Sequence, residues 1–259
     1  MILFVYSLVV LIATFLGSFI GLGGGVIIKP VFDLINVHTL PEIAFLSSCA
    51  VFSMSIASTT RHIIKKTPIK ASVVLLISVG SVAGGILGNF LFNKAISVAP
   101  SQNIVKGFQS LTLFLLLICV ILSVKGDLKS FKVKNPIAIV LSGLLLGTTA
   151  AFLGIGGGPI NVAFLTLMFS FTMKDAAVYS VAIIFFSQLS NIIITYIKTG
   201  FVGFPVKILW VIIPCAVIGG LIGSMFNRKC DEKVIKTTFI TSVAMIASLS
   251  LFNAIIAFS

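Results

Sequence analysis

Two glycine clusters inside apolar sequence are the residues most suggestive of chemistry. The clusters are Gly23-Gly24-Gly25 and Gly156-Gly157-Gly158-Pro159. Consecutive glycines disfavour a helix, whereas proline suits the first turn of a new one. We therefore expect each cluster to end one helix and begin another, whose free N–H groups and positive dipole end would bind an anion. The alternative is that the glycines only allow close helix packing. A nucleotide-binding loop is disfavoured because no Lys-Ser/Thr follows them.

Polar side chains in the segment after the second cluster extend this predicted site. On a helix, Ser180, Ser187 and Asn191 fall on one face, and Gln188 lies beside them. The residue that matches Ser180 in the first half of the chain is Ser47. Hydroxyl groups in membrane helices often bond only to their own backbone, so the amides are the stronger candidates for contact with a substrate.

Ionisable residues are few. Lys29 follows the first cluster by four residues, where it would either pair with the anion or extend to the membrane interface. Near the second cluster the corresponding candidate is an uncharged amide, Asn161, at the start of the following segment. Asp33, Glu42 and Asp175 lie near the predicted ends of segments, so proton coupling through them is left open, and the sequence gives no support for it. With two histidines and no carboxylate cluster, we predict no metal site, no cofactor and no acid–base enzyme.

The composition is that of a membrane protein. Of the 259 residues, 58% are hydrophobic and 9% are charged, and the mean hydropathy is +1.23. A soluble domain carries about 25% charged residues, so a soluble enzyme, a disordered chain and a disulfide scaffold are excluded. The net charge of +12 is better explained by basic cytoplasmic loops than by binding to nucleic acid.

Hydrophobic segments long enough to cross a bilayer recur along the whole chain. A spanning helix needs about 20 mostly apolar residues. Eight segments qualify: 2–20, 41–60, 70–92, 102–123, 136–153, 175–197, 204–226 and 235–257. Two further apolar segments, 26–36 and 159–171, each follow a glycine cluster and are about half the length needed.

The two halves of the chain resemble each other. GLGGG at 21–25 matches GIGGG at 154–158 with an offset of 133, and VAGGILG at 82–88 matches VIGGLIG at 217–223 with an offset of 135. These matches predict a duplication, with a first membrane repeat over 1–123, a basic cytoplasmic loop over 124–135 and a second membrane repeat over 136–259. Four glycine pairs have the spacing of close helix packing: Gly17 and Gly21, Gly84 and Gly88, Gly143 and Gly147, and Gly219 and Gly223.

The basic residues indicate how the segments are arranged. Eight plain crossings would divide the Lys and Arg residues almost equally between the two sides, ten against eight. If 2–36 and 136–171 are re-entrant hairpins, one side instead holds five, namely Lys29, Lys94, Lys106, Lys198 and Lys207. The other side then holds thirteen: Arg61, Lys65, Lys66, Lys70, Lys125, Lys129, Lys132, Lys134, Lys174, Arg228, Lys229, Lys233 and Lys236. Only this topology satisfies the positive-inside rule clearly, and it places both termini outside the cytoplasm.

The predicted fold is an all-α polytopic membrane protein. It has two homologous halves arranged as inverted repeats, because three crossings per half reverse the second copy. Each half contains a glycine-broken re-entrant helix hairpin and three membrane crossings. Discontinuous helices that meet at the midplane of an inverted repeat are a common way for secondary transporters to bind substrate.

Three stretches resemble one known family. GSFIGLGGGVIIKP (17–30), AAFLGIGGGPINVAFLTLMF (150–169) and KDAAVYSVAIIFFSQLSNI (174–192) look like the TauE/SafE sulfite-exporter family of prokaryotic membrane proteins. The resemblance covers essentially the whole chain and implies transport of small sulfur-containing anions such as sulfite or organosulfonates. The first half has Met54 and Ser55 where the second has Ser187 and Gln188, which argues against a strictly symmetric site.

These observations together predict a multi-pass secondary transporter for a small anion in the plasma membrane of a prokaryote. Transport would be secondary because the sequence contains no motif for nucleotide hydrolysis. The expected partners are the anionic substrate and the lipid bilayer, with no nucleic acid, and homo-oligomerisation is left open. The alternative is a non-transporting membrane scaffold or assembly subunit, which would not need costly buried polar residues at the helix breaks.

Overall fold

The computed structural model describes residues 2–67, 70–126, 131–133 and 135–258 as an almost entirely helical bundle. The helices are α1 (Ile2–Ile20), α2 (Gly25–Ile35), α3 (Leu40–Ile64), α4 (Ala71–Val98), α5 (Gln102–Lys125), α6 (Pro136–Leu153), α7 (Gly158–Phe169), α8 (Met173–Thr199), the short 3-10 helix η1 (Val206–Ile208), α9 (Leu209–Lys229) and α10 (Glu232–Phe258). Eight of these α-helices are long and apolar enough to span a membrane, whereas α2 and α7 are shorter. The predicted all-α polytopic fold is confirmed.

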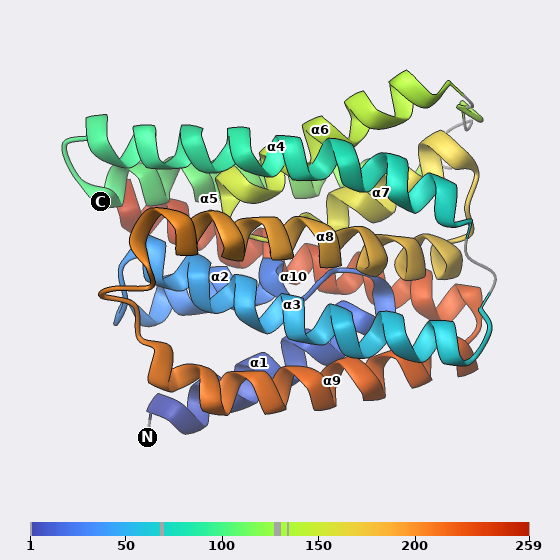
Figure 1. Cartoon of the computed structure of the whole chain (residues 1–259), viewed down its shortest axis with the longest axis horizontal. Coiled ribbons are helices and arrows are strands. Elements are labelled where there is room, and N and C mark those ends of the chain that lie inside the picture. The colour runs from blue at the N-terminus through green and yellow to red at the C-terminus, as the bar shows by residue number, and fades with distance from the viewer. Residues whose placement is uncertain (1, 68–69, 127–130, 134, 259) are drawn as a thin grey trace.

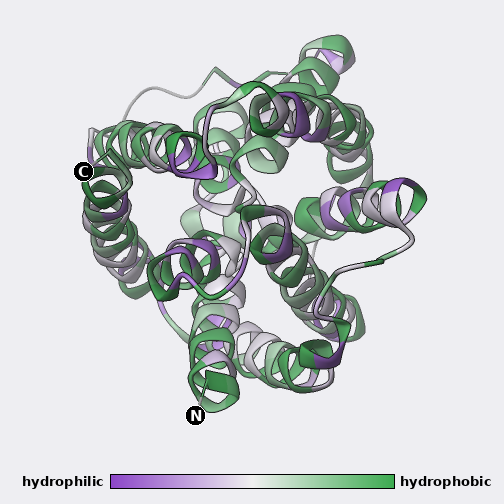
Figure 2. Ribbon diagram, turned by 90° about the vertical axis from the view of Figure 1, so that its left-hand side faces the viewer, coloured by the Kyte–Doolittle hydropathy of each residue, from purple (hydrophilic) through white to green (hydrophobic). Residues whose placement is uncertain are grey.

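Most helices run along the long axis of the molecule, so the bundle has two ends (Figure 1). One end carries the connections after α3, α5, α7 and α9, and is here called the basic end. The other carries both chain termini and is here called the termini end. Of the thirteen basic residues grouped by the sequence argument, Lys129 and Lys134 lie outside the described residues, and the remaining eleven lie toward the basic end. Viewed from the termini end, the ribbons are coloured mostly as hydrophobic (Figure 2).

Each glycine cluster separates the two arms of a helical hairpin. Helix α1 ends at Ile20 and α2 returns antiparallel to it, so that the rings of Tyr6 and Phe32 stack with centroids 4.2 Å apart. In the second half α6 ends at Leu153 and α7 returns toward its start, where the Phe131 N–H donates to the Leu167 carbonyl at 2.9 Å. The first hairpin has both ends at the termini end and the second has both at the basic end (Figure 1).

Backbone conformation explains why both hairpin turns require glycine. Three glycines in each turn have positive φ at equivalent positions: Gly21, Gly23 and Gly24 in the first, and Gly154, Gly156 and Gly157 in the second. A residue with a side chain would lose roughly 1–2 kcal/mol in that conformation. Helices α2 and α7 therefore begin where the sequence predicts, and Pro159 occupies the first turn of α7.

Each half packs one of its long helices against the hairpin of the other half. Helix α4 of the first half lies parallel to α6 of the second, with Gly80 against Val140 and Gly88 against Thr148. Reciprocally, α9 lies parallel to α1, with Gly219 against Thr14.

Equivalent helices of the two halves run in opposite directions. The start of α5 contacts the end of α10 through Gly107 and Phe258. Helix α3 runs antiparallel to α8, and the equivalent residues Phe52 and Phe185 stack at 5.4 Å (Figure 1). An inverted repeat requires this antiparallel relation. Which end of the bundle faces the cytoplasm is a separate question, and the assignment of the basic end to the cytoplasm stays a prediction.

One of the predicted packing pairs needs correction. Gly17 and Gly21 do not form a helix–helix contact surface, because Gly21 lies beyond the end of α1 with φ +79°. Gly17 instead contacts Gly24 inside its own hairpin, where a Cβ would overlap the Gly24 backbone. The other three pairs do lie at helix contacts.

Two adjacent glycines in α4 provide a test of this packing. A Cβ at Gly84 would overlap the Leu144 carbonyl of α6, whereas one at Gly85 would make an ordinary contact 3.4 Å from Asn191 Oδ1. We expect Gly84→Ala to lower the unfolding free energy by about 1–3 kcal/mol, as overpacking does. Gly85→Ala is the matched control and should unfold near the native temperature in detergent. Equal melting temperatures for the two variants would contradict the close α4–α6 packing.

Candidate functional site

The two hairpin turns meet at the centre of the bundle. A Cβ at Gly25 would lie 2.5 Å from the Ile155 carbonyl oxygen, and one at the equivalent Gly158 would overlap the Leu22 carbonyl oxygen. The backbones of the turns are therefore in direct contact. Helices α2 and α7 lead away from this point in opposite directions, so the N-terminus of α2 faces the basic end and that of α7 faces the termini end (Figure 1).

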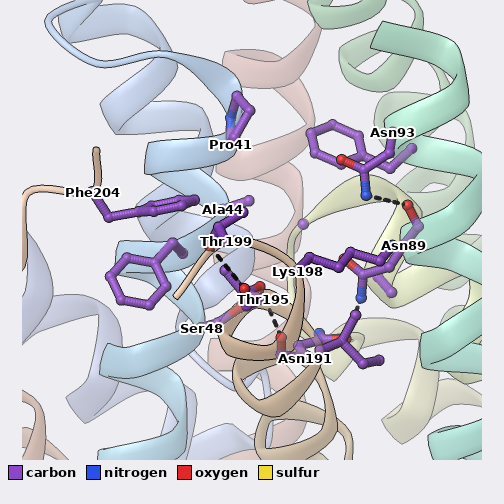
Figure 3. A pocket seen from close by; sticks show the side chains of 15 residues that line it. Pro41, Ala44, Ser48, Asn89, Asn93, Asn191, Thr195, Lys198, Thr199 and Phe204 are labelled. Carbon is purple, nitrogen blue, oxygen red and sulfur yellow. Dashed lines mark hydrogen bonds between the residues drawn. The ribbon is translucent and has the colours of Figure 1, made fainter. Parts of the chain in front are cut away.

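A polar cavity of about 250 Å³ leads from the termini end to the second hairpin turn. It lies between α3, α4 and α8 and reaches Ala151 and Gly154 (Figure 3). Asn89 Nδ2 donates to Asn191 Oδ1 at 2.8 Å, and Lys198 is exposed at the mouth. The residues lining this cavity include no carboxylate. Apolar residues form the rest of the lining, and its polar part, made of amides, hydroxyls and one lysine, suits an anion.

A larger crevice of about 790 Å³ lies elsewhere between the same three helices. Its lining is mostly apolar and includes the stacked rings of Phe52 and Phe185. We assign the polar site to the smaller cavity because it reaches the glycine turn and the larger crevice does not.

Gln188 precedes Asn191 by three residues on α8, and its exposed fraction is 1%. Its Nε2 atom has no hydrogen-bond partner, and a Cβ at Gly156 would lie 3.3 Å from it. An unpartnered buried donor costs about 1–3 kcal/mol, so its presence beside the turn needs an explanation. A bound acceptor would supply the missing partner.

The start of α7 adds backbone donors beside Gln188. Its N-cap residue is Gly157, with φ 79° and no side-chain cap. The first N–H groups of a helix have no partner within the helix, and they carry the positive end of its dipole. Asn161 is 3% exposed, and its Oδ1 would lie 3.2 Å from a Cβ at Gly157, so the Asn161 amide covers the same turn.

The serines that were predicted to line the site are already engaged elsewhere. Ser180 Oγ donates to the Gly21 carbonyl at 2.8 Å, which fastens α8 to the first hairpin turn. Ser187 Oγ donates to the Ile184 carbonyl in its own helix at 3.1 Å. Ser47 is buried against Gly25, where its Oγ would lie 3.0 Å from a Cβ. The structure thus groups Gln188, Asn191 and Asn161 near the second turn, although only Asn191 lines the cavity, and it gives Ser180 and Ser187 backbone partners.

Of the two alternatives for Lys29, extension to the membrane interface is wrong. Lys29 is 3% exposed, and its Nζ lies 2.7 Å from Asp33 Oδ2 in a buried ion pair. The side chain turns along α2 because Asp33 lies four residues ahead, on the same face of the helix.

Six polar cavity residues were not predicted: Ser48, Asn89, Asn93, Thr195, Lys198 and Thr199. For Thr195 and Lys198 a signal was present, because they continue the helical face of Asn191 at spacings of four and seven. Asn89 and Asn93 come from α4, and only the packing of α4 on α8 brings them to this cavity.

The matching positions toward the basic end are closed. Gly21 is equivalent to Gly154, yet a Cβ at Gly21 would lie 2.5 Å from Ala177 Cα, whereas one at Gly154 would lie 3.4 Å from the Cβ of the equivalent Ala44. Ser58, which matches Asn191, is fully buried, and its Oγ lies 2.8 Å from Ser18 Oγ. The structure therefore has an accessible polar cavity at the termini end and a packed counterpart at the basic end.

A polytopic helical bundle with two glycine-broken hairpins meeting at its centre, and with a polar cavity leading to the second of them, has an architecture that membrane transporters use. The chain belongs to the Sulfite exporter TauE/SafE family, whose profile matches residues 6–250. The resemblance seen in the glycine motifs is confirmed. No solved structure shows significant similarity to the chain.

Curated relatives agree with this membership. The chain is 25% identical to the probable membrane transporter protein YunE of Bacillus subtilis over 87% of its own length and 88% of that protein. It is 27% identical to the probable membrane transporter protein MJ0441 of Methanocaldococcus jannaschii over 84% of each chain. It is 30% identical to a probable membrane transporter protein of Haemophilus influenzae over 60% of its length and 59% of that protein. The protein is thus a membrane transporter with a multi-pass arrangement in the plasma membrane.

Proposed function

We propose that the protein is a secondary transporter of a small anion, and that the anion binds between the inner end of the polar cavity at Gly154 and the start of α7. The unpartnered Nε2 donor of Gln188 is the observation that carries this proposal. It lies against Gly156, beside the first N–H groups of α7, and the helix dipole there favours negative charge. Lys198 at the mouth would attract the anion from solution.

The size of the cavity and the family both favour a small sulfur-containing anion such as sulfite or an organosulfonate. A cavity of about 250 Å³ is below the usual range for drug-sized ligands and accepts an oxyanion with little else attached. Family membership supports the sulfur chemistry, because the family description names sulfite.

The pseudo-symmetry supports a mechanism of alternating exposure. In the present state the second hairpin turn packs more loosely on α3 than the first turn packs on α8. If the halves exchange these two arrangements, Gly154 would close against Ala44 while Gly21 separates from Ala177. The central site would then communicate with the basic end, where Ser58, His62 and Asn227 are now buried.

Accessibility of an equivalent pair of positions tests this mechanism and the topology together. Thr195 lines the cavity at the termini end, and its equivalent in the first half is His62, which is 1% exposed. In a background lacking the four free cysteines, we expect a charged thiol reagent to label Thr195→Cys only from outside the cell and His62→Cys only from the cytoplasm. Reagent applied to right-side-out and inside-out vesicles measures this.

Substrate should change the two labelling rates in opposite directions, because one side closes as the other becomes accessible. Asp175→Cys, at an exposed position near the basic end, is the control and should be labelled from the cytoplasm at a rate independent of substrate. Labelling of Thr195→Cys and His62→Cys from the same side would contradict the mechanism.

A further inference from the structure

Asp33 differs from every other acidic residue that the structure describes, because its carboxylate is buried and has no capping role. Its exposed fraction is 2%. Glu42 caps α3 by accepting from the Thr39 N–H at 2.7 Å, and Glu232 accepts from the N–H groups of Met173 and Lys174 at the start of α8. Asp175 and Asp231 are exposed at helix starts. A carboxylate inside a membrane protein is costly and commonly marks a functional site.

Two lysines approach Asp33 from different helices. Lys29 Nζ of α2 lies 2.7 Å from Asp33 Oδ2, and Lys106 Nζ of α5 donates to the Asp33 carbonyl at 2.5 Å and to Asn36 Oδ1 at 3.3 Å. The second carboxylate oxygen, Asp33 Oδ1, is buried without a hydrogen-bond partner. Lys106 is partly exposed at the termini end, so water can approach the cluster from that side.

Neighbouring helices add little other charge at this point. Helix α1 contributes Tyr6, which stacks on Phe32, and α10 contributes the neutral Asn253, which donates to the Pro30 carbonyl at 2.8 Å. At the start of α3, Glu42 is occupied by Thr39 and lies 3.5 Å from His38. The described residues of α7 include no titratable side chain. The cluster of Asp33, Lys29 and Lys106 thus carries one net positive charge when Asp33 is ionised.

The ion pair lies directly behind the turn that the anion cavity reaches. Lys29 Cδ and Cε would both lie 3.4 Å from a Cβ at Gly154, and Gly154 lines the cavity. The positions equivalent to Lys29 and Asp33 in the second half are Val162 and Thr166, so the duplicated sequence holds this ion pair in one copy only. A change in the charge of Asp33 can therefore alter the electrostatic environment of the anion site, because the Lys29 side chain lies against both.

We propose that Asp33 is the proton-binding site of the transporter and couples one proton to each transported anion. This inference rests on the proposed anion transport. A proton from water at the termini end would bind the free Oδ1, no other bond would form or break, and the carboxylate charge would be lost. The charges of Lys29, whose side chain lies beside Gly154, and of Lys106 would then be uncompensated, which raises the affinity of the site for an anion. By linkage the bound anion raises the proton affinity of Asp33 by the same factor, so both are carried in the same direction.

Methanesulfonate in proteoliposomes tests the coupling, because this probe remains a monoanion across the working pH range. The native protein should exchange internal for external methanesulfonate at equal pH. It should also accumulate the anion when the interior is alkaline, by about tenfold per pH unit for a one-to-one cotransport. Asp33→Asn should retain exchange and lose the accumulation.

Two further variants keep the test decisive. The double variant Lys29→Gln with Asp33→Asn leaves no unpaired charge from the ion pair, so it should fold. It should exchange methanesulfonate with weaker affinity and should not accumulate it in response to a pH gradient. Asp175→Asn, at an exposed carboxylate, should accumulate like the native protein. Accumulation that persists in Asp33→Asn, or that requires an acidic interior, would overturn the proposal. Loss of exchange in the folded double variant would also overturn it, whereas a native protein that exchanges no anion at all would refute the proposed function itself.

Discussion

Gly158→Ala should abolish anion transport. The added Cβ would overlap the Leu22 carbonyl oxygen, so the two hairpin turns would have to separate at the point where the site is formed. Overpacking of this kind costs about 1–3 kcal/mol of unfolding free energy, and here it also displaces the N–H groups at the start of α7. Initial rates of labelled-anion exchange in proteoliposomes, together with the melting temperature in detergent, measure both effects.

Gly203→Ala is the control for an added methyl group without steric overlap. Gly203 has a left-handed conformation with φ +82°, which Gly158 does not have, and a Cβ there meets no atom within 4 Å. This variant should lose only about 1–2 kcal/mol from its left-handed conformation and transport normally. Normal exchange by folded Gly158→Ala would show that contact between the two turns is not needed for transport.

Gln188→Leu should lose transport at low anion concentration while keeping its fold. A hydrogen bond to a charged ligand contributes about 1.5–3 kcal/mol, so its loss should weaken anion affinity by roughly 10- to 100-fold. The fold should be as stable as native or more so, because Nε2 has no partner in the protein and leucine removes the cost of burying it. Concentration dependence of exchange and the melting temperature measure the two predictions.

Ser187→Ala, one residue away, is the control for the Gln188 variant. Ser187 Oγ bonds only to the Ile184 carbonyl of its own helix, so its removal should leave transport and stability near native. If Gln188→Leu exchanges the anion with native affinity, the amide is a packing group and the site lies elsewhere.

The sequence was sufficient to predict where the helices break. Glycine clusters at a constant offset fixed both hairpins, because Gly24 and Gly157 adopt positive φ immediately before α2 and α7. The structure adds that Thr39 and Thr172, which the same offset relates, are the N-caps of α3 and α8. These features depend on local backbone conformation, which residue type determines strongly.

Features that depend on tertiary packing could not be predicted. Asn89 reaches the cavity only because α4 of the first half packs beside α8 of the second. The difference between the turns, with Gly21 tight against Ala177 and Gly154 looser against Ala44, is invisible in two nearly identical glycine motifs.

The ion pair of Lys29 and Asp33 can be predicted from the sequence. Its spacing of four residues is that of a helical charge pair. Taken singly, Lys29 is interpreted as an anion partner and Asp33 as a residue near the end of a segment. Taken as a pair, they form a buried ion pair. Only the structure shows that the pair is buried and lies behind Gly154.

Counterflow in proteoliposomes tests the central claim most directly. Purified protein is reconstituted into vesicles loaded with unlabelled sulfite or methanesulfonate, and entry of the same labelled anion is followed at equal pH. We expect rapid transient accumulation of the label, competed by other small sulfur oxyanions and absent with Gln188→Leu. If the folded native protein gives the same entry as protein-free vesicles for sulfite and for methanesulfonate, the assignment of a small sulfur-containing anion as substrate is contradicted.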